Sequence, residues 1–154
     1  MKCGFIFKKT KTFFWMYRNN NFRFFVLEHQ LRKRIKKIIK MGYRHFIVEM
    51  TAGIGTLFAE LIIQEKKHTP SITLECVLPC IGYEKSWSWY FRDKLMIIFS
   101  YANKISFAVK GDYQKYCIQK AKNYILEKSS VCIITKTKNF FISIEEIFSN
   151  NLNL

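Results

Sequence analysis

Short apolar runs alternate along this chain with longer segments in which apolar residues recur every three or four positions. The first pattern is typical of buried β-strands and the second of amphipathic helices. The expected strands are residues 3–7, 45–50, 72–78, 105–109, 131–135 and, as a sixth, 140–144. The expected helices are residues 22–41, 56–67, 86–99 and 113–127. Gly42 and Pro79 stand at junctions, where we expect them to end a helix and a strand, respectively.

Strands that alternate with helices of this length predict parallel strands joined by right-handed helical crossovers. Such crossovers cover both faces of the sheet, which explains why the strands are almost continuously apolar. The sequence therefore predicts an α/β fold, a Rossmann-like three-layer sandwich around a mostly parallel sheet of five to six strands. No repeat or linker divides the sequence, so we expect one domain over residues 1–154, with residues 145–154 as a frayed tail.

Positive charge is concentrated near the start of the chain. The formal net charge is +15, and residues 1–50 hold 13 of the 26 lysines and arginines but 2 of the 11 acidic residues. Such a segment attracts nucleic acid, anionic lipid or a phosphorylated ligand. The alternative interpretation, which we favour, is a solvated helix face, because no specific nucleic-acid motif accompanies the charge.

The sequence offers little for a membrane span or a metal site. No uncharged apolar run approaches the ~18 residues of a membrane span, and the Lys-rich start does not resemble a signal peptide. We therefore expect a cytoplasmic protein with five reduced thiols. Cys76 and Cys80 are four residues apart, but no second Cys/His pair stands nearby. We expect no metal and no cofactor.

Ligands of open α/β sheets bind beyond the carboxyl ends of the strands, where the strand order reverses. The segment Thr51–Gly55 follows the second expected strand there, and its small residues would let a phosphate approach the start of the next helix. The pattern alone is weak, because any tight strand-to-helix turn favours glycine. Glu49 is also an anion beside the place of the phosphate. On the pattern alone we favour a structural turn.

Several short stretches share their order and spacing with one known family. The segment Phe46–Gly55 reads Phe-Ile-Val-Glu-Met-Thr-Ala-Gly-Ile-Gly and is similar to a family stretch that usually reads Phe-Ile-Ser-Gly-Met-Ala-x-Gly-Val-Asp. Further matches are Phe13-Phe14-Trp15-Met16-Tyr17, Ala59-Glu60, Leu78-Pro79-Cys80, Lys85-Ser86-Trp87, Ala102-Asn103-Lys104 and Cys117-Ile118-Gln119-Lys120. Over residues 2–135 the chain thus resembles the YpsA-like branch of the SLOG superfamily. The resemblance implies a Rossmann-like domain that binds a nucleotide or a nucleotide-derived ligand.

The polar positions of that family pattern differ in this chain. Ile6–Thr10 stands where the family usually has Thr-Gly-His-Arg-Pro, Val48-Glu49 replaces Ser-Gly, Gly55 replaces Asp, and Ala121-Lys122 replaces Arg-Asn. The family's late Gly-Gly-Thr loop and last helix have no counterpart in the sequence. Scaffold positions persist while ligand-facing ones have changed, which implies a different ligand or none. A missing last helix would also expose part of the sheet and favour a homodimer.

No set of residues makes a persuasive catalytic centre. His29 and His68 lie on charged helical stretches, and His45 has no evident Ser or carboxylate partner. Trp87, Tyr90 and Phe91 could stack on a base, but at helical spacing we expect them to pack on the sheet. We leave enzymatic activity open and favour its absence.

Three functional hypotheses remain. The first is a module that binds a nucleotide-like small molecule at the turn after the second strand. Its candidate ligand residues are Lys8, Lys9, Thr51, Ala52, Gly53, Gly55, Glu60, Pro79, Trp87 and Gln119. The second is a degenerate family member without a ligand site that acts through protein contacts. The third is electrostatic binding of nucleic acid or an anionic surface by the basic helix at residues 22–41.

Overall fold

The computed structural model describes residues 1–8, 22–138 and 141–148, in which strands and helices alternate along the chain. The strands are β1 (Lys2–Lys8), β2 (His45–Glu49), β3 (Thr73–Cys80), β4 (Lys104–Val109), β5 (Val131–Lys138) and β6 (Phe141–Phe148). The helices are α2 (Phe22–Lys40), α3 (Ile54–His68), the short 3-10 helix η1 (Tyr83–Ser86), α4 (Trp89–Tyr101) and α5 (Lys115–Lys128). No helix in the described ranges is long and apolar enough to cross a membrane.

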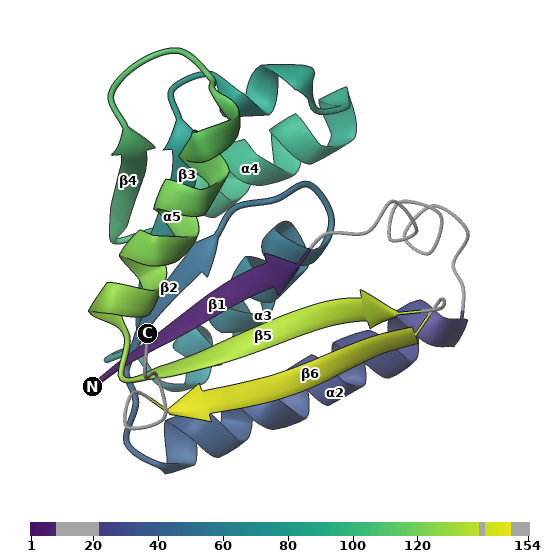
Figure 1. The fold of residues 1–154 in the computed structure, drawn as a ribbon. Helices are drawn as coiled ribbons and strands as arrows, with labels where there is room; N and C mark the ends of the chain where they lie inside the picture. Colours follow the sequence, from purple (N-terminus) through teal and green to yellow (C-terminus); the bar gives the residue numbers. More distant parts are fainter. Residues whose placement is uncertain (9–21, 139–140, 149–154) are drawn as a thin grey trace.

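The strands form a six-stranded sheet in the order β4-β3-β2-β1-β5-β6 (Figure 1). The pairs from β4 to β5 are parallel, whereas β6 runs antiparallel to β5. The order reverses between β1 and β5, because the chain runs outward to β4 and then returns through α5 to the other side of β1. The predicted α/β fold with a mostly parallel sheet is confirmed.

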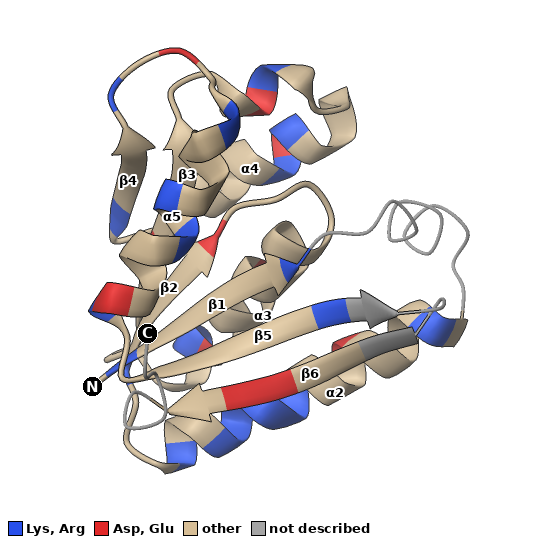
Figure 2. Ribbon diagram, in the orientation of Figure 1, with Lys and Arg blue, Asp and Glu red and all other residues tan. Residues whose placement is uncertain are grey.

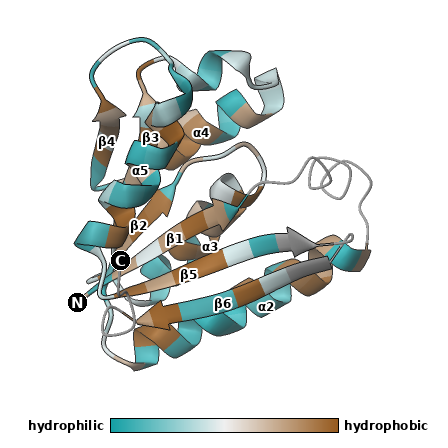
Figure 3. Ribbon diagram, in the orientation of Figure 1, coloured by the Kyte–Doolittle hydropathy of each residue, from teal (hydrophilic) through white to brown (hydrophobic). Residues whose placement is uncertain are grey.

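Helices lie on both faces of the sheet, which gives the three layers of a Rossmann-like sandwich. Apolar side chains of α2, α3 and α4 pack on one face together with β1, β2, β3 and β5. Phe5 of β1 and Phe58 of α3 stack there with ring centroids 3.9 Å apart. A smaller cluster joins α5 to the other face through Ala121 and Ile125. Figure 3 shows the hydrophobic strands between these two layers.

Helix α2 follows the predicted periodicity closely. Leu27, Leu31, Ile35 and Ile38 recur at helical spacing, and all four are buried against the sheet. The helix ends at Lys40, and Gly42 then takes a positive φ of 95° that favours glycine. Lysines in the last turn lie where the helix dipole favours cations.

Two expectations for the middle of the chain were wrong. Pro79 does not end the third strand, because β3 continues to Cys80. The backbone groups of Pro79 point toward β2, as those of Val77 do. Strand β2 ends at Glu49, which pairs with Val77, so no residue of β2 lies opposite Pro79. The N–H group that proline lacks is therefore not needed for a hydrogen bond to β2. Trp87 precedes α4 rather than belonging to it, since that helix begins at Trp89.

The end of the chain also differs from the expectation of a frayed tail over residues 145–154. Strand β6 extends through Phe148 and pairs with β5 along its whole length. The sixth strand therefore extends beyond the predicted residues 140–144, and it forms the edge of the sheet next to β5. Residues 149–154 lie outside the described ranges.

Candidate functional site

The carboxyl ends of β1 and β2 meet beside the point where the strand order reverses. Ligands of doubly wound sheets bind at such points. Lys8 ends β1 and is exposed, while Glu49 ends β2 and is buried. The α3 helix begins just beyond β2. These elements bring together part of the predicted site.

Two amides in the turn from β2 to α3 donate hydrogen bonds to another residue of the same turn. The Gly55 N–H donates to the Thr51 hydroxyl oxygen at 3.1 Å, and the Thr56 N–H donates to the Thr51 carbonyl at 3.2 Å. Thr51 thus occupies two amides at the helix start that a bound phosphate would need. Residues 53–56 are buried. These two amides are therefore bonded within the turn and are not available to a ligand.

Glycine is required at two places in this turn. Gly53 has a φ of 99°, in the region that side chains rarely adopt. A Cβ on Gly55 would collide with the Glu49 carbonyl oxygen and come within 2.8 Å of the Thr51 hydroxyl oxygen. Glycine at these positions therefore lets the start of α3 pack closely against the backbone at the end of β2. This agrees with the structural interpretation of the Gly-x-Gly pattern.

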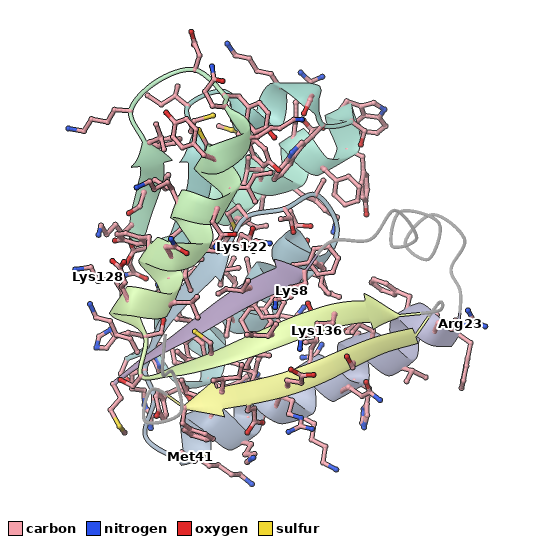
Figure 4. The ribbon with its side chains drawn as sticks, in the orientation of Figure 1. Lys8, Arg23, Met41, Lys122, Lys128 and Lys136 are labelled. Carbon is pink, nitrogen blue, oxygen red and sulfur yellow. The ribbon has the colours of Figure 1, made fainter. Side chains whose placement is uncertain are left out.

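The Glu49 side chain lies between the end of β1 and the middle of α5, and 2% of the residue is exposed. Its Oε2 atom accepts a hydrogen bond from the Phe7 N–H at 2.9 Å. Its Oε1 atom lies 4.0 Å from the Lys122 ammonium, and that ammonium also donates to the Phe7 carbonyl oxygen at 2.9 Å. Figure 4 shows Lys122 on α5 and Lys8 at the end of β1. The buried carboxylate thus has one hydrogen-bond donor, the Phe7 N–H, and one cation at ion-pair distance, Lys122.

Burial dominates the electrostatics of Glu49. Desolvation raises the pKa of this carboxyl to about 7, although Lys122 and the Phe7 N–H act in the opposite direction. The charge of this carboxylate also acts on Tyr83 of η1. Burial and then the charge of Glu49 raise the pKa of Tyr83 to about 12, so this phenol stays neutral. The Glu49 carboxyl can therefore gain or lose a proton close to neutrality.

The remaining predicted site residues are spread over several elements. Pro79 is buried near the end of β3, and Trp87 packs half-buried against the edge of the core. Glu60 accepts a 2.7 Å bond from Lys94 of α4. Gln119 is exposed on α5 and donates to Asn123 at 2.8 Å. The structure brings Thr51, Ala52, Gly53 and Gly55 together on the turn, whereas Glu60 and Gln119 have local partners elsewhere.

Part of the sequence pattern lies where the structure gives no description. Lys9 and the Phe13–Tyr17 motif fall outside the described residues. The aromatic expectation for the α4 region holds in part, because Phe91 is buried as predicted. Tyr90 is 42% exposed instead, since it lies on the outer side of the helix.

Sequence reasoning did not identify Lys122 and Tyr83 as neighbours of Glu49. Lys122 adjoins Ala121, and Cys117, Ala121 and Ile125 form the buried stripe of α5. This placement beside a buried stripe was a usable signal that Lys122 reaches toward the sheet. Its pairing with a residue more than 70 positions earlier depends on the strand order, which the sequence pattern does not specify.

The described residues hold no group of three or more potential metal ligands. All five cysteines are free and buried. The chemistry available at this edge of the sheet is therefore proton exchange on Glu49 and cation contacts from Lys122 and Lys8.

A known protein family matches this chain. The model of the YspA SLOG family matches residues 9–140, which is most of the chain. No curated protein matches the sequence.

Proposed function

Because this chain belongs to the YspA SLOG family, we propose that it binds a nucleotide or a nucleotide-derived ligand at the carboxyl edge of its sheet, in competition with its own Glu49 carboxylate. The fold supports this location, since ligands of such sheets bind where the strand order reverses. The family resemblance supports the class of ligand. The competition follows from the contacts of Glu49.

The bonding of Glu49 is the observation that carries the proposal. The Phe7 N–H of β1 donates a hydrogen bond to this carboxylate, and the Lys122 ammonium of α5 pairs with it at 4.0 Å. A backbone amide beside an ammonium is also the donor set that a phosphate uses. The Glu49 carboxylate therefore lies where a ligand phosphate would bind. A phosphate can contact the Phe7 N–H and the Lys122 ammonium only when the Glu49 carboxylate no longer does so.

The protonation of Glu49 controls this exchange. A protonated carboxyl no longer attracts Lys122, so the ammonium becomes available to the ligand. Since the pKa of Glu49 is raised to about 7, we expect the affinity to increase as the pH falls through neutrality. Among the described residues, Lys122 and the neutral Tyr83 interact electrostatically with this carboxyl. Lys8, exposed at the end of β1, supplies a second cation.

This arrangement moves the ligand away from the turn itself. The amides of Gly55 and Thr56 are bonded to Thr51, so the phosphate would contact Lys122 and β1 rather than the start of α3. The Thr51–Gly55 turn then acts as a structural support of the site.

Thermal shift measurements on the full chain test the proposal with nucleoside mono-, di- and triphosphates at about pH 6 and about pH 8. We expect the native chain to be stabilised more at the lower pH, because a ligand stabilises the state that binds it. Glu49→Gln removes the competing charge and should respond at both values. Lys122→Met should lose the response. Glu127→Gln changes an exposed carboxylate on α5 and should behave like the native chain.

A second candidate function is a closed domain that acts through protein contacts. The occupied amides and the buried turn favour it, since they leave no free anion site at the start of α3. It predicts no thermal shift in any variant, Glu49→Gln included. That result would contradict the nucleotide proposal and support the closed domain.

A further inference from the structure

One face of α2 combines exposed aromatic residues with a track of lysines. Residues three or four positions apart share one side of a helix. The residues of this outward face, called the α2 face below, are Phe22, Phe25, His29, Lys33, Lys36 and Lys40. All six are exposed, because the opposite side of α2 holds the residues buried against the sheet.

The aromatic end of the α2 face is unusually open to solvent. Phe22 is 78% exposed and Phe25 is 54% exposed. Phe25 meets Phe24 edge to ring, with centroids 6.0 Å apart, and Phe24 in turn packs against the core. The Phe25 ring thus contacts Phe24 on one side, while much of its surface stays accessible to solvent. Exposed aromatic rings of this kind are stacking platforms for bases.

The other end of the α2 face is positively charged with little compensation. Lys36 lies 3.9 Å from Glu65. Lys33 and Lys40 have no carboxylate partner among the residues that the structure describes. Figure 2 shows the basic residues that follow one another along α2. This end of the face therefore offers free ammonium groups to an anionic partner.

A groove continues this track toward the last strand. Its volume is about 930 Å³, and its lining includes Lys33, Lys37, Lys40, Met41, Ser143 and Ile144. Within it, Lys37 binds Glu146 of β6 at 2.8 Å, so part of the charge is neutralised. The concave shape allows a flexible chain to lie along the helix with lysines on one side.

We propose that the α2 face binds single-stranded nucleic acid. The lysines would contact successive phosphates, and Phe22 and Phe25 would stack on bases at the other end of the strand. From Phe22 to Lys40 the helix spans about 27 Å, enough for several nucleotides. This proposal goes beyond the nucleotide site, because it uses neither Glu49 nor Lys122.

The same charges could attract an anionic membrane, but the packing of α2 disfavours that partner. An interfacial helix inserts a long apolar stripe into the lipid. The apolar stripe of α2 is buried against the sheet. The exposed apolar surface of the α2 face is limited to the two rings at its start, and these fit bases better than a bilayer.

Fluorescence anisotropy with oligo-dT and oligo-U of about 12 nucleotides, at several salt concentrations, tests the proposal on the full chain. We expect the logarithm of the binding constant to fall linearly with the logarithm of the salt concentration. Lys33→Gln/Lys40→Gln should flatten the slope by about 1.4 and weaken binding roughly 20-fold at ~0.1 M salt, since each phosphate contact contributes about 0.7 to the slope. Phe22→Ala/Phe25→Ala should weaken binding at least about tenfold and leave the slope unchanged.

Matched variants control for charge and for aromatic content. Lys120→Gln/Lys128→Gln removes two exposed lysines from α5, on the other side of the sheet. Tyr101→Ala/Tyr116→Ala removes two aromatic rings that are 51% and 55% exposed. We expect both pairs to bind within about twofold of the native chain, because they leave the phosphate and base contacts intact. All changed residues are exposed, so circular dichroism should show the native fold throughout.

Four results would overturn the proposal. These are the absence of oligonucleotide binding, equal losses in the lysine pair and its α5 control, unchanged affinity in the phenylalanine pair, and tighter binding to a duplex of the same length than to either single strand. Binding to vesicles of phosphatidylserine and phosphatidylcholine without binding to oligonucleotides would assign the face to a membrane instead. Glu49→Gln should leave oligonucleotide binding unchanged, which separates this test from that of the nucleotide site.

Discussion

The two faces of the central sheet differ in how much they are covered and in what they bury. Under α2, α3 and α4, the buried side chains form one large apolar cluster that extends over four strands. Under α5 the apolar cluster is smaller. Charged groups also lie on the α5 face, where Lys122 reaches Glu49 and Lys104 reaches Glu75. The first face holds the larger apolar cluster, whereas the second holds Glu49, the carboxyl whose pKa burial raises to about 7.

Glu75 illustrates how the α5 face accommodates charge. Its Oε1 atom accepts hydrogen bonds from Ser106 and Tyr124, each at 2.6 Å, and lies 3.0 Å from the Lys104 ammonium. Burial alone would raise the pKa of Glu75, but these three partners together lower it. Glu49 has fewer partners and more burial, and its pKa moves upward. Burial and the number of partners together decide the direction of the shift on this face.

The largest expected effect comes from the three-helix face. Phe58→Ala removes a fully buried ring that stacks on Phe5. We expect the free energy of unfolding to fall by about 3–5 kcal/mol, because the cavity adds to the lost burial. Chemical denaturation measures the change. Ile125→Ala on α5 is the matched variant and should cost less, near the lower end of ~2–5 kcal/mol. Equal or larger losses at Ile125 would contradict the difference between the faces.

An intermediate effect concerns the pH dependence of stability. The pKa of Glu49 is about 7 in the folded chain against a model value of 4.5. A raised pKa means that the folded state holds the proton more tightly, so this contribution is full below about pH 4.5 and is lost as the pH rises through about 7. The loss amounts to at most about 3 kcal/mol. Unfolding curves from about pH 5 to about pH 8 should show this decline.

Glu49→Gln is the control for that decline. The amide does not titrate, so the variant should lose less stability than the native chain over the same pH range. Parallel curves for the two proteins would show that Glu49 has an ordinary pKa in the folded state. The α5 face would then not be the source of pH sensitivity.

The smallest effect tests an exception on the apolar face. Thr135 is fully buried on β5, and its hydroxyl has no hydrogen-bond partner in the part of the chain that the structure describes. Thr135→Val removes this polar atom with little change of shape. We expect a gain of about 1 kcal/mol in the free energy of unfolding, measured by denaturation. A loss of similar size would show that the hydroxyl is satisfied and that the face tolerates polar groups through specific bonds.

The sequence predicted the elements of the fold well, because buried strands and amphipathic helices leave clear periodicities. Residues 22–41 are an example, since the expected helix differs from α2 by one residue. The boundaries were less predictable where long-range pairing decides them. Pro79 stays in β3 because β2 ends early, and β6 extends to Phe148 because β5 is long enough to pair with it.

The candidate site was less predictable than the fold. The position of Glu49 beside the turn was expected, but the sequence left open whether its side chain is buried, because carboxylates are mostly exposed unless they are paired. Burial is possible here because the Phe7 N–H and Lys122 lie within reach. These partners come from β1 and α5, and their approach depends on the strand order. Local sequence patterns carry no information on such contacts.

The antiparallel strand β6 has a consequence for self-association. An edge strand resists the addition of another chain when charged side chains stand at its centre. Glu145 and Glu146 occupy that place in β6, and Glu146 turns inward to Arg34 and Lys37. At the opposite edge, Ile105–Val109 of β4 contains no charged residue, and Ile105 and Phe107 are each 40% exposed. Of the two edges, β4 therefore has less electrostatic protection along its middle against the addition of another strand.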